Sequence, residues 1–156
     1  MRVGIGLDAH ALVKGKKLIL GGVEVDWHKG LEGHSDGDAL LHAICDALLG
    51  AAALGDLGRY FPSDDRAFKN IDSRILLRKV KEILDEKGCR IVNIDAVIIA
   101  QKPRMTPYIE AMTANIAEDT GLPVSAVSVK STSTDRLGFA GREEGIATQA
   151  IAMIKM

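Results

Sequence analysis

The sequence has few cysteines, few aromatic residues and no long apolar run. Its only cysteines, Cys45 and Cys89, are outside any C-x-x-C spacing, so neither a disulfide framework nor a cysteine metal site is predicted. Aromatic residues make up 4 % and the formal net charge is -1, which argues against a nucleic-acid surface. No segment approaches the roughly 18 apolar residues of a membrane span, and Asp8 precedes any signal-peptide apolar run. We therefore expect a cytoplasmic protein that binds neither nucleic acid nor membrane.

The composition is that of a chain that folds. Hydrophobic residues make up 47 % of the 156 residues and charged residues 26 %, which is ordinary for a globular protein and too apolar for a disordered one. The length is near the commonest size of a single domain. One domain spanning residues 1–156 is therefore predicted.

Strands and helices alternate without a strict βαβ pattern. Hydrophobic periodicity and capping residues predict helices over 39–49, 73–86 and 107–119. Strand signals cover 3–7, 17–20, 23–25, 90–101, 127–130 and 146–154, with a hairpin turning at Gly21-Gly22. This order favours an α+β two-layer sandwich of a mixed sheet and helices over a doubly wound sheet.

Asp8, His10 and His42 are candidate metal ligands. Asp8 and His10 are two residues apart, so on a strand both side chains leave the same face. His42 lies in an expected helix, with Asp38 and Asp46 on the same stripe, and Asp46 is a candidate for orienting the His42 ring. Two imidazoles and a carboxylate suit zinc or a similar divalent cation, with one position left open for a substrate oxygen. The alternative is a polar strand end beside a helix with one exposed histidine.

A second candidate site is the hydroxyl-rich run Ser131–Thr134, followed by Asp135 and Arg142. Hydroxyls can donate to phosphate oxygens, an arginine can pair with them, and an aspartate can bind magnesium or manganese beside them. Arg104 lies in a short basic turn that could also clamp a diphosphate. A plain solvated turn is the alternative for both segments.

Two further patterns are weak evidence for a functional site. Ser35 or Asp36 is expected to begin the helix that contains His42, with phosphate contact as a secondary role. The run Gly4-Ile5-Gly6-Leu7-Asp8-Ala9 satisfies G-x-G-x-x-A, but only three residues precede it and no crossover helix follows. Dinucleotide binding is therefore not predicted.

Taken together, the motifs closely resemble those of the 2-C-methyl-D-erythritol 2,4-cyclodiphosphate synthase family of non-mevalonate isoprenoid biosynthesis. They are spread over nearly the whole chain: Asp8-Ala9-His10, His34-Ser35-Asp36-Gly37-Asp38, His42, Gly55-Asp56-Leu57-Gly58, Phe61-Pro62-Ser63-Asp64, Gln101-Lys102-Pro103 and Gly138-Phe139-Ala140-Gly141-Arg142. The resemblance implies a homotrimer with active sites between subunits and a cytidine diphosphate-linked small-molecule substrate. It also implies that the 2-phosphate of 4-diphosphocytidyl-2-C-methyl-D-erythritol 2-phosphate attacks the β-phosphorus, giving the cyclic diphosphate and CMP. Such an enzyme positions the phosphates and neutralises their charge.

The resemblance also assigns residue roles. Zinc or a similar cation would be held by Asp8, His10 and His42, and magnesium or manganese by Asp135. The catalytic positions would be His34, Ser133 and Asp135. Substrate contacts would come from Asp8, His10, His34, Ser35, Asp56, Gly58, Phe61, Asp65, Ala100, Arg104, Met105, Thr106, Ser131, Thr132, Ser133, Thr134, Asp135, Phe139 and Arg142.

The chain departs from the family pattern at three of these positions. Ser133, Asp135 and Arg104 stand where threonine, glutamate and lysine are usual, and each replacement keeps its chemical group. The aspartate is one methylene shorter than glutamate, which leaves direct coordination of the second metal open.

Two other functions use the same residues. A metal-dependent phosphohydrolase would use an open zinc position to activate water. A non-catalytic trimeric binding module would use the metal only to brace its fold. The concentration of His34, Asp56, Ser133 and Asp135 in loops favours an enzyme, because loop positions contribute little to bracing.

Overall fold

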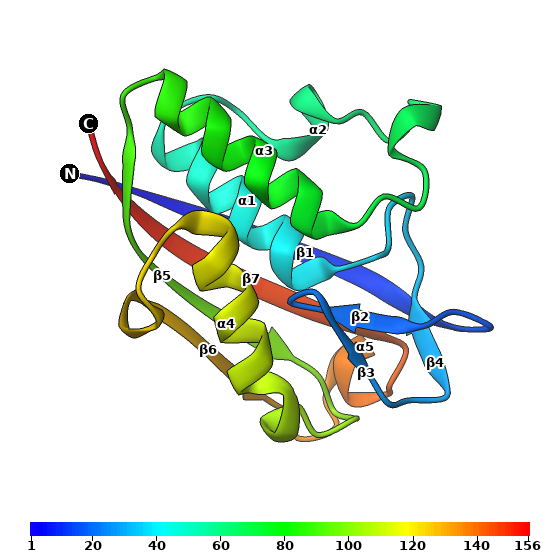
Figure 1. The fold of residues 1–156 in the computed structure, drawn as a ribbon. Helices are drawn as coiled ribbons and strands as arrows, with labels where there is room; N and C mark the ends of the chain where they lie inside the picture. The colour runs from blue at the N-terminus through cyan, green and yellow to red at the C-terminus, as the bar shows by residue number, and fades with distance from the viewer.

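A mixed sheet of five strands underlies the helices of the chain (Figure 1). In the computed structural model, which describes residues 1–156, these strands are β1 (Arg2–Lys14), β4 (Lys29–Leu31), β5 (Arg90–Ile99), β6 (Val127–Thr132) and β7 (Gly145–Lys155). Their order is β4-β1-β7-β5-β6. The β5–β6 pair is parallel and the other pairs are antiparallel. The predicted α+β fold with a mixed sheet is therefore confirmed.

The remaining elements agree closely with the sequence pattern. The helices are α1 (Ala39–Ala51), α2 (Leu57–Tyr60), α3 (Ser73–Glu86), α4 (Ile109–Thr120) and α5 (Gly138–Gly141), with 3₁₀ turns at Arg66–Phe68, Thr106–Tyr108 and Val124–Ala126. The predicted hairpin is β2 (Leu18–Leu20) paired with β3 (Val23–Val25). The tail predicted as a strand is β7. The first strand was predicted too short, because pairing with β7 and then with β4 extends β1 to Lys14.

Two glycines of β1 let α1 lie directly on the sheet. A Cβ atom added at Gly6 would lie 1.9 Å from the carbonyl oxygen of Ala43, and one at Gly4 would lie 2.0 Å from that of Ala47. Any side chain here would push the helix away, because a contact of this kind is far inside the van der Waals distance. The Gly4–Gly6 spacing therefore serves helix packing, and it brings His42, the residue before Ala43, down onto β1.

Asp38 joins the first hairpin to α1. Its buried carboxylate accepts hydrogen bonds from the backbone N–H groups of Gly21 at 2.9 Å, Gly22 at 2.7 Å and Leu41 at 3.0 Å. Burial raises the pKa of Asp38 to about 6. The prediction that Ser35 or Asp36 begins this helix is wrong, because the hairpin places its glycine N–H groups at Asp38, which is the N-cap.

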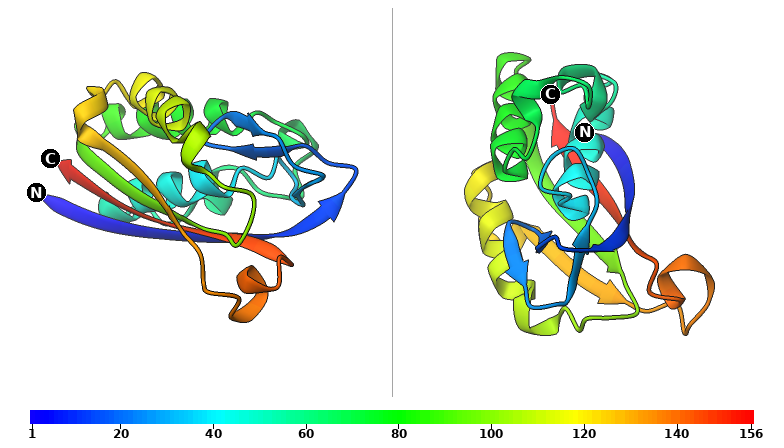
Figure 2. Two further views of the ribbon diagram at one scale, coloured as in Figure 1. Left: turned by 90° about the horizontal axis from the view of Figure 1, so that it is seen from below. Right: turned by 90° about the vertical axis from the view of Figure 1, so that its right-hand side faces the viewer.

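The other face of the sheet is apolar and open. Val3, Ile5 and Leu7 of β1 are 61 %, 61 % and 64 % exposed, and Ile151 of β7 is 47 % exposed. In the left view of Figure 2 the longer helices and the hairpin gather on one side of the sheet, while α5 lies on the opposite side. Single exposed apolar residues are common, but a contiguous row on one face marks an interaction surface.

Cys45 and Cys89 are both buried and unpaired, so they form no disulfide. None of the helices is both long enough and apolar enough to cross a membrane. The cytoplasmic location stays a prediction.

Candidate active site

Asp8, His10 and His42 meet at one point between β1 and α1. Oδ2 of Asp8 lies 2.7 Å from Nε2 of His10 and 3.0 Å from Nδ1 of His42. One ligand atom from each residue lies within 4.8 Å of the other two. Two imidazole nitrogens and one carboxylate oxygen are the donors of a catalytic zinc site with an open position. The predicted grouping is therefore confirmed as a set that can hold a divalent cation.

The charges in this cluster are coupled. Burial opposes ionisation of Asp8, but hydrogen bonds from His10 and His42 outweigh it and lower the pKa of Asp8 to about 2. The hydrogen bond to Asp8 raises the pKa of His10, although burial acts in the opposite direction. The carboxylate is thus ready to bind a cation, whereas a proton on His10 must leave before that ring can act as a ligand.

We expect the affinity for zinc to rise with pH through the neutral range. Below the raised pKa of His10, each ion that binds must displace a proton from this ring, so affinity falls as pH falls; above that pKa the competition ends. Competition titrations against a chelator of known pH dependence, between about pH 6 and 8, check this expectation. An affinity that does not change with pH over this range would contradict it.

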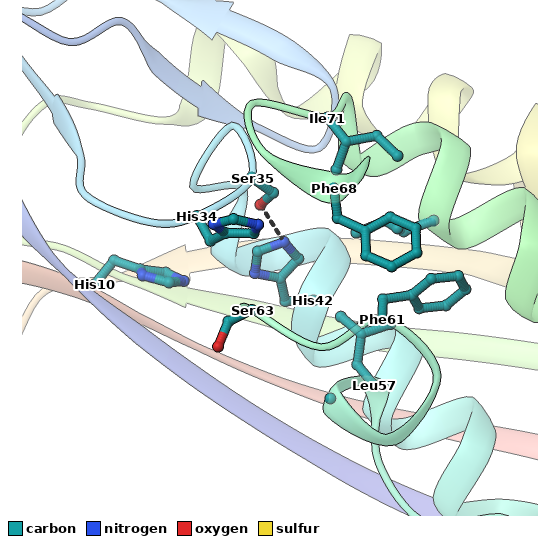
Figure 3. A pocket seen from close by; sticks show the side chains of 11 residues that line it. His10, His34, Ser35, His42, Leu57, Phe61, Ser63, Phe68 and Ile71 are labelled. Atoms are coloured by element: carbon teal, nitrogen blue, oxygen red, sulfur yellow. Dashed lines mark hydrogen bonds between the residues drawn. The ribbon is translucent and has the colours of Figure 1, made fainter. Parts of the chain in front are cut away.

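A cavity of about 220 Å³ opens beside two of these ligands, His10 and His42 (Figure 3). Its polar end is lined by His10, His34, Ser35 and His42, and its other walls by Leu57, Gly58, Phe61, Ser63, Phe68, Ile71 and Leu76. The polar end can bind phosphate oxygens and the apolar walls can enclose a carbon skeleton. A small phosphorylated molecule therefore fits the chemistry of this cavity.

His34 ties the loop Phe61–Asp65 to the cavity. Its Nε2 donates to the carbonyl oxygen of Asp65 at 2.8 Å, so Nδ1 is the acceptor of the neutral ring. Gly58 and Phe61 line the cavity, whereas the Asp56 carboxylate caps α2 through Arg59 N–H at 3.0 Å. The structure thus brings His34, Gly58 and Phe61 to the metal ligands and gives Asp56 a structural partner.

Asp46 does not orient His42. Its Oδ1 accepts the backbone N–H of Leu57 at 2.7 Å, which anchors the start of α2. The prediction is wrong because both ring nitrogens of His42 have other partners: Nδ1 faces Asp8 at 3.0 Å, and Nε2 faces the hydroxyls of Ser35 and Ser73, both 2.9 Å away. Sequence reasoning missed Ser73, whose only local signal is its place at the start of α3.

The second candidate site begins on β6, the edge strand of the sheet that is farthest from β1. Asp8 on β1 pairs with Thr148 on β7, and Thr148 pairs with Ile98 on β5. Ile98 in turn pairs with Ser131 on β6, so Asp8 and Ser131 are three strand spacings apart, roughly 14 Å. Within one chain, the start of the hydroxyl-rich run is therefore separated from Asp8, and Asp135 does not belong to the cluster of metal-ligating side chains.

The segments Ala100–Thr106 and Ser131–Asp135 lie together. The N–H of Ala100 donates to the carbonyl oxygen of Thr132 at 3.0 Å, and Arg136 N–H donates to Oε1 of Gln101 at 3.0 Å. Met105 is buried and holds this turn, while Arg104 and Thr106 are exposed. These two segments, which contain many of the predicted substrate contacts, therefore form one continuous surface.

Several side chains of this surface have local partners. Thr134 Oγ1 donates to the Leu137 carbonyl oxygen at 2.6 Å, and Thr132 Oγ1 to that of Ser133 at 3.1 Å. Asp135 has a φ of +51°, and its carboxylate accepts from Ser133 Oγ at 3.5 Å. The loop is therefore a folded turn that exposes the Ser133 hydroxyl and the Asp135 carboxylate.

Phe139 lies between the two candidate sites. It lines one cavity of about 360 Å³ with His10 and another of about 550 Å³ with Asp135. Arg142 is exposed and donates from Nε to Glu144 at 2.8 Å, which holds the pKa of Glu144 below its ordinary value. Neither residue reaches the metal ligands through a hydrogen bond of its own chain.

Fold and site together define an α+β protein in which three side chains that can hold a metal ion lie beside a cavity of about 220 Å³. The YgbB family model matches residues 1–155. The chain therefore belongs to the YgbB family.

Individual relatives agree with this assignment. The chain is 59 % identical over 155 residues to the 2-C-methyl-D-erythritol 2,4-cyclodiphosphate synthase of Thiobacillus denitrificans, covering 99 % of this chain and 97 % of the relative. A solved 2C-methyl-D-erythritol-2,4-cyclodiphosphate synthase in its CDP-bound form superposes with a TM-score of 0.90 at 28 % identity, covering 99 % of this chain and 100 % of that one. The bifunctional IspDF of Campylobacter jejuni superposes with a TM-score of 0.95 at 40 % identity. This chain is covered to 99 % but spans 42 % of the bifunctional protein. The resemblance inferred from the motifs is thus confirmed.

Proposed function

We propose that this chain converts 4-diphosphocytidyl-2-C-methyl-D-erythritol 2-phosphate to 2-C-methyl-D-erythritol 2,4-cyclodiphosphate and CMP. The observation that carries the proposal is the convergence of Asp8, His10 and His42 beside a cavity that can enclose a small phosphorylated molecule. The near-complete coverage of relatives named for this reaction supports it. We further propose that residues 1–156 act as one domain.

The reaction needs no nucleophile from the protein. An oxygen of the 2-phosphate forms a bond to the β-phosphorus while the bond from that phosphorus to the bridging oxygen breaks, and CMP leaves with the bridging oxygen. The chain must therefore bend the substrate, exclude water and neutralise the phosphate oxygens. The apolar walls at Leu57, Phe61 and Phe68 suit the first two tasks, and Ser35 can donate a hydrogen bond for the third.

Asp8, His10 and His42 would hold zinc or a similar divalent cation. The fit rests on their donor atoms, two nitrogens and one oxygen within mutual reach. Bound there, the ion would supply positive charge beside the β-phosphate oxygens. The lowered pKa of Asp8 supports this role, because the carboxylate is ionised throughout the neutral range.

Asp135 would hold magnesium or manganese together with the substrate diphosphate. It is exposed, and its carboxylate belongs to no cluster of metal-ligating side chains. Magnesium commonly takes one or two carboxylates and completes its shell with phosphate oxygens and water. His34 and Ser133 would stabilise the transition state, and Ala100–Thr106 would bind the cytidine.

We propose a homotrimer in which neighbouring chains complete each site. Two observations support it. Asp8 and Ser131, where the hydroxyl-rich run leading to Asp135 begins, are roughly 14 Å apart within one chain, too far to grip the same two phosphates. The open sheet face is apolar at Val3, Ile5 and Leu7, so packing against further copies would remove this surface from water.

Ile5→Lys is expected to yield monomers that release little CMP. Ile5 is 61 % exposed in the single chain, so the charge leaves the fold intact but would be buried in the assembly at a large cost. Sedimentation should show the 16.7 kDa chain mass for the variant and three times that mass for the wild type.

Val124→Lys is the control for this interface. Val124 is equally exposed, at 60 %, but lies in a 3₁₀ turn away from the apolar row, so this variant should stay trimeric and active. A monomeric Ile5→Lys protein that retains full activity would contradict the shared site.

Phosphorus NMR of the products tests the proposed reaction. We expect CMP and a cyclic diphosphate in equal amounts. Linear phosphates in stoichiometric yield would instead show a metal-dependent phosphohydrolase. A protein that unfolds without metal and binds no cytidine nucleotide would be a metal-braced binding module.

A further inference from the structure

The imidazole of His42 has two nitrogens with different surroundings. Nδ1 faces Asp8 at 3.0 Å, on the side where the metal ligands converge. Nε2 faces the hydroxyl oxygens of Ser73 and Ser35, each at 2.9 Å. A histidine can bind a metal through Nδ1 only if the proton of the neutral ring is on Nε2. The direction of the hydrogen bonds at Nε2 therefore decides whether this residue can act as a ligand.

Asp36 determines that direction. Its Oδ1 accepts from the Ser73 hydroxyl at 2.5 Å and from Asp38 N–H at 3.1 Å, while its Oδ2 accepts from Ser73 N–H at 3.0 Å. Both carboxylate oxygens thus receive N–H donors, and the single hydroxyl hydrogen of Ser73 is directed to Asp36. Ser73 is fully buried, so water cannot offer its hydroxyl another partner, and its other acceptor, Ser35 Oγ, is 3.5 Å away, much farther than Asp36.

With its hydrogen directed to Asp36, the Ser73 oxygen can only accept from His42. We propose that Ser73, anchored by Asp36, is a positioning residue that keeps the proton of His42 on Nε2 and so directs the Nδ1 lone pair at the metal. This inference rests on the proposed metal site. Ser35 cannot substitute for Ser73, because no other hydrogen bond fixes the direction of the Ser35 O–H. The Ser35 hydroxyl can therefore either accept from Nε2 or donate to it. Hydrogen bonds behind metal ligands commonly change metal affinity by 10 to 100-fold.

Zinc affinity of the whole protein, measured by competition with a chelator in the absence of substrate, tests this proposal. Ser73→Ala is expected to bind zinc about 10 to 100-fold more weakly than the wild type. Asp36→Asn should weaken binding as well, because its amide can donate to the Ser73 oxygen and turn the hydroxyl hydrogen toward Nε2. This second variant preserves the shape of the side chain and keeps the test available if Ser73→Ala does not fold.

Asp72→Ala is the matched structural control. Asp72 caps the same helix start through Arg74 N–H at 2.9 Å and has no hydrogen bond to Ser73 or His42. This variant should lower the melting temperature and leave zinc affinity unchanged. If it weakens zinc binding as much as Ser73→Ala, the role of Ser73 is merely structural.

Nitrogen-15 NMR can detect the proton on Nε2 of His42 directly. The chain contains four histidines, so ¹⁵N-histidine labelling of the zinc-loaded wild type should give a resolvable, slowly exchanging Nε2–H signal from His42. This signal should disappear in Ser73→Ala through faster exchange. If zinc affinity is unchanged in Ser73→Ala and Asp36→Asn and the Nε2–H signal is retained, this inference is wrong but the proposed metal site still stands. Failure of the wild type to hold zinc would overturn the metal site and this inference with it.

Discussion

Replacing His42 with alanine is expected to remove the tightly held metal and almost all CMP release together. Asp8 and His10 alone offer two ligands, which is fewer than a catalytic zinc site uses. Loss of several kcal/mol of charge stabilisation corresponds to at least about a thousandfold in rate. Metal analysis of dialysed protein, alongside CMP release, measures both effects. His28→Ala is the control, because His28 is exposed and outside the cavity.

Asp135→Asn should weaken the second proposed metal site and leave the first one intact. Asp135 does not belong to the cluster Asp8, His10 and His42 that could hold a metal ion, so the variant should retain zinc through dialysis while turnover falls on the order of a hundredfold. Part of that turnover should return at high magnesium or manganese, because an amide oxygen and the substrate phosphates still coordinate weakly. Loss of zinc from this variant, or full activity at low magnesium, would show that the assignment of two separate sites is wrong.

Gly6→Ala should destabilise the protein severely and weaken metal binding. The added Cβ would lie 1.9 Å from the Ala43 carbonyl oxygen, and backbone atoms cannot rotate out of the way as a side chain can. The helix must therefore move off β1, at a cost of at least about 3 kcal/mol. His42 moves with it, away from Asp8. Denaturant unfolding and zinc competition, at one protomer concentration, measure these losses.

Gly50→Ala on the same helix provides a control, because this substitution should raise the free energy of unfolding rather than lower it. A Cβ atom at Gly50 would have one neighbour, the Ile5 carbonyl oxygen at 3.9 Å, and the residue is exposed. Alanine is favoured over glycine inside a helix by roughly 0.5 to 1 kcal/mol. Stabilisation here with destabilisation at Gly6 would show that contact with β1, rather than helix propensity, is responsible. Equal stability of the two variants would contradict this account.

Local patterns in the sequence predicted much of the molecule. Helix α3 has the predicted bounds, residues 73–86, because helix ends depend on the backbone groups of a few neighbouring residues. Asp8 and His10 share a face because side chains alternate along any strand. The choice of His42 as their partner came from the pattern of histidines and acids together with the resemblance to a known family.

Contacts between distant segments could not be predicted in this way. Ser73 is 31 residues from His42 in the chain, and it reaches the ring because α3 packs over α1. The partner of Asp46 was misassigned for the same reason, since the turn at Leu57 offers an N–H that helical periodicity cannot reveal. The separation of Ser131 from Asp8 follows from the strand order β1-β7-β5-β6. Residue types and short spacings thus determined which chemistry is available, whereas helix packing and strand order decided which of these groups meet within one chain.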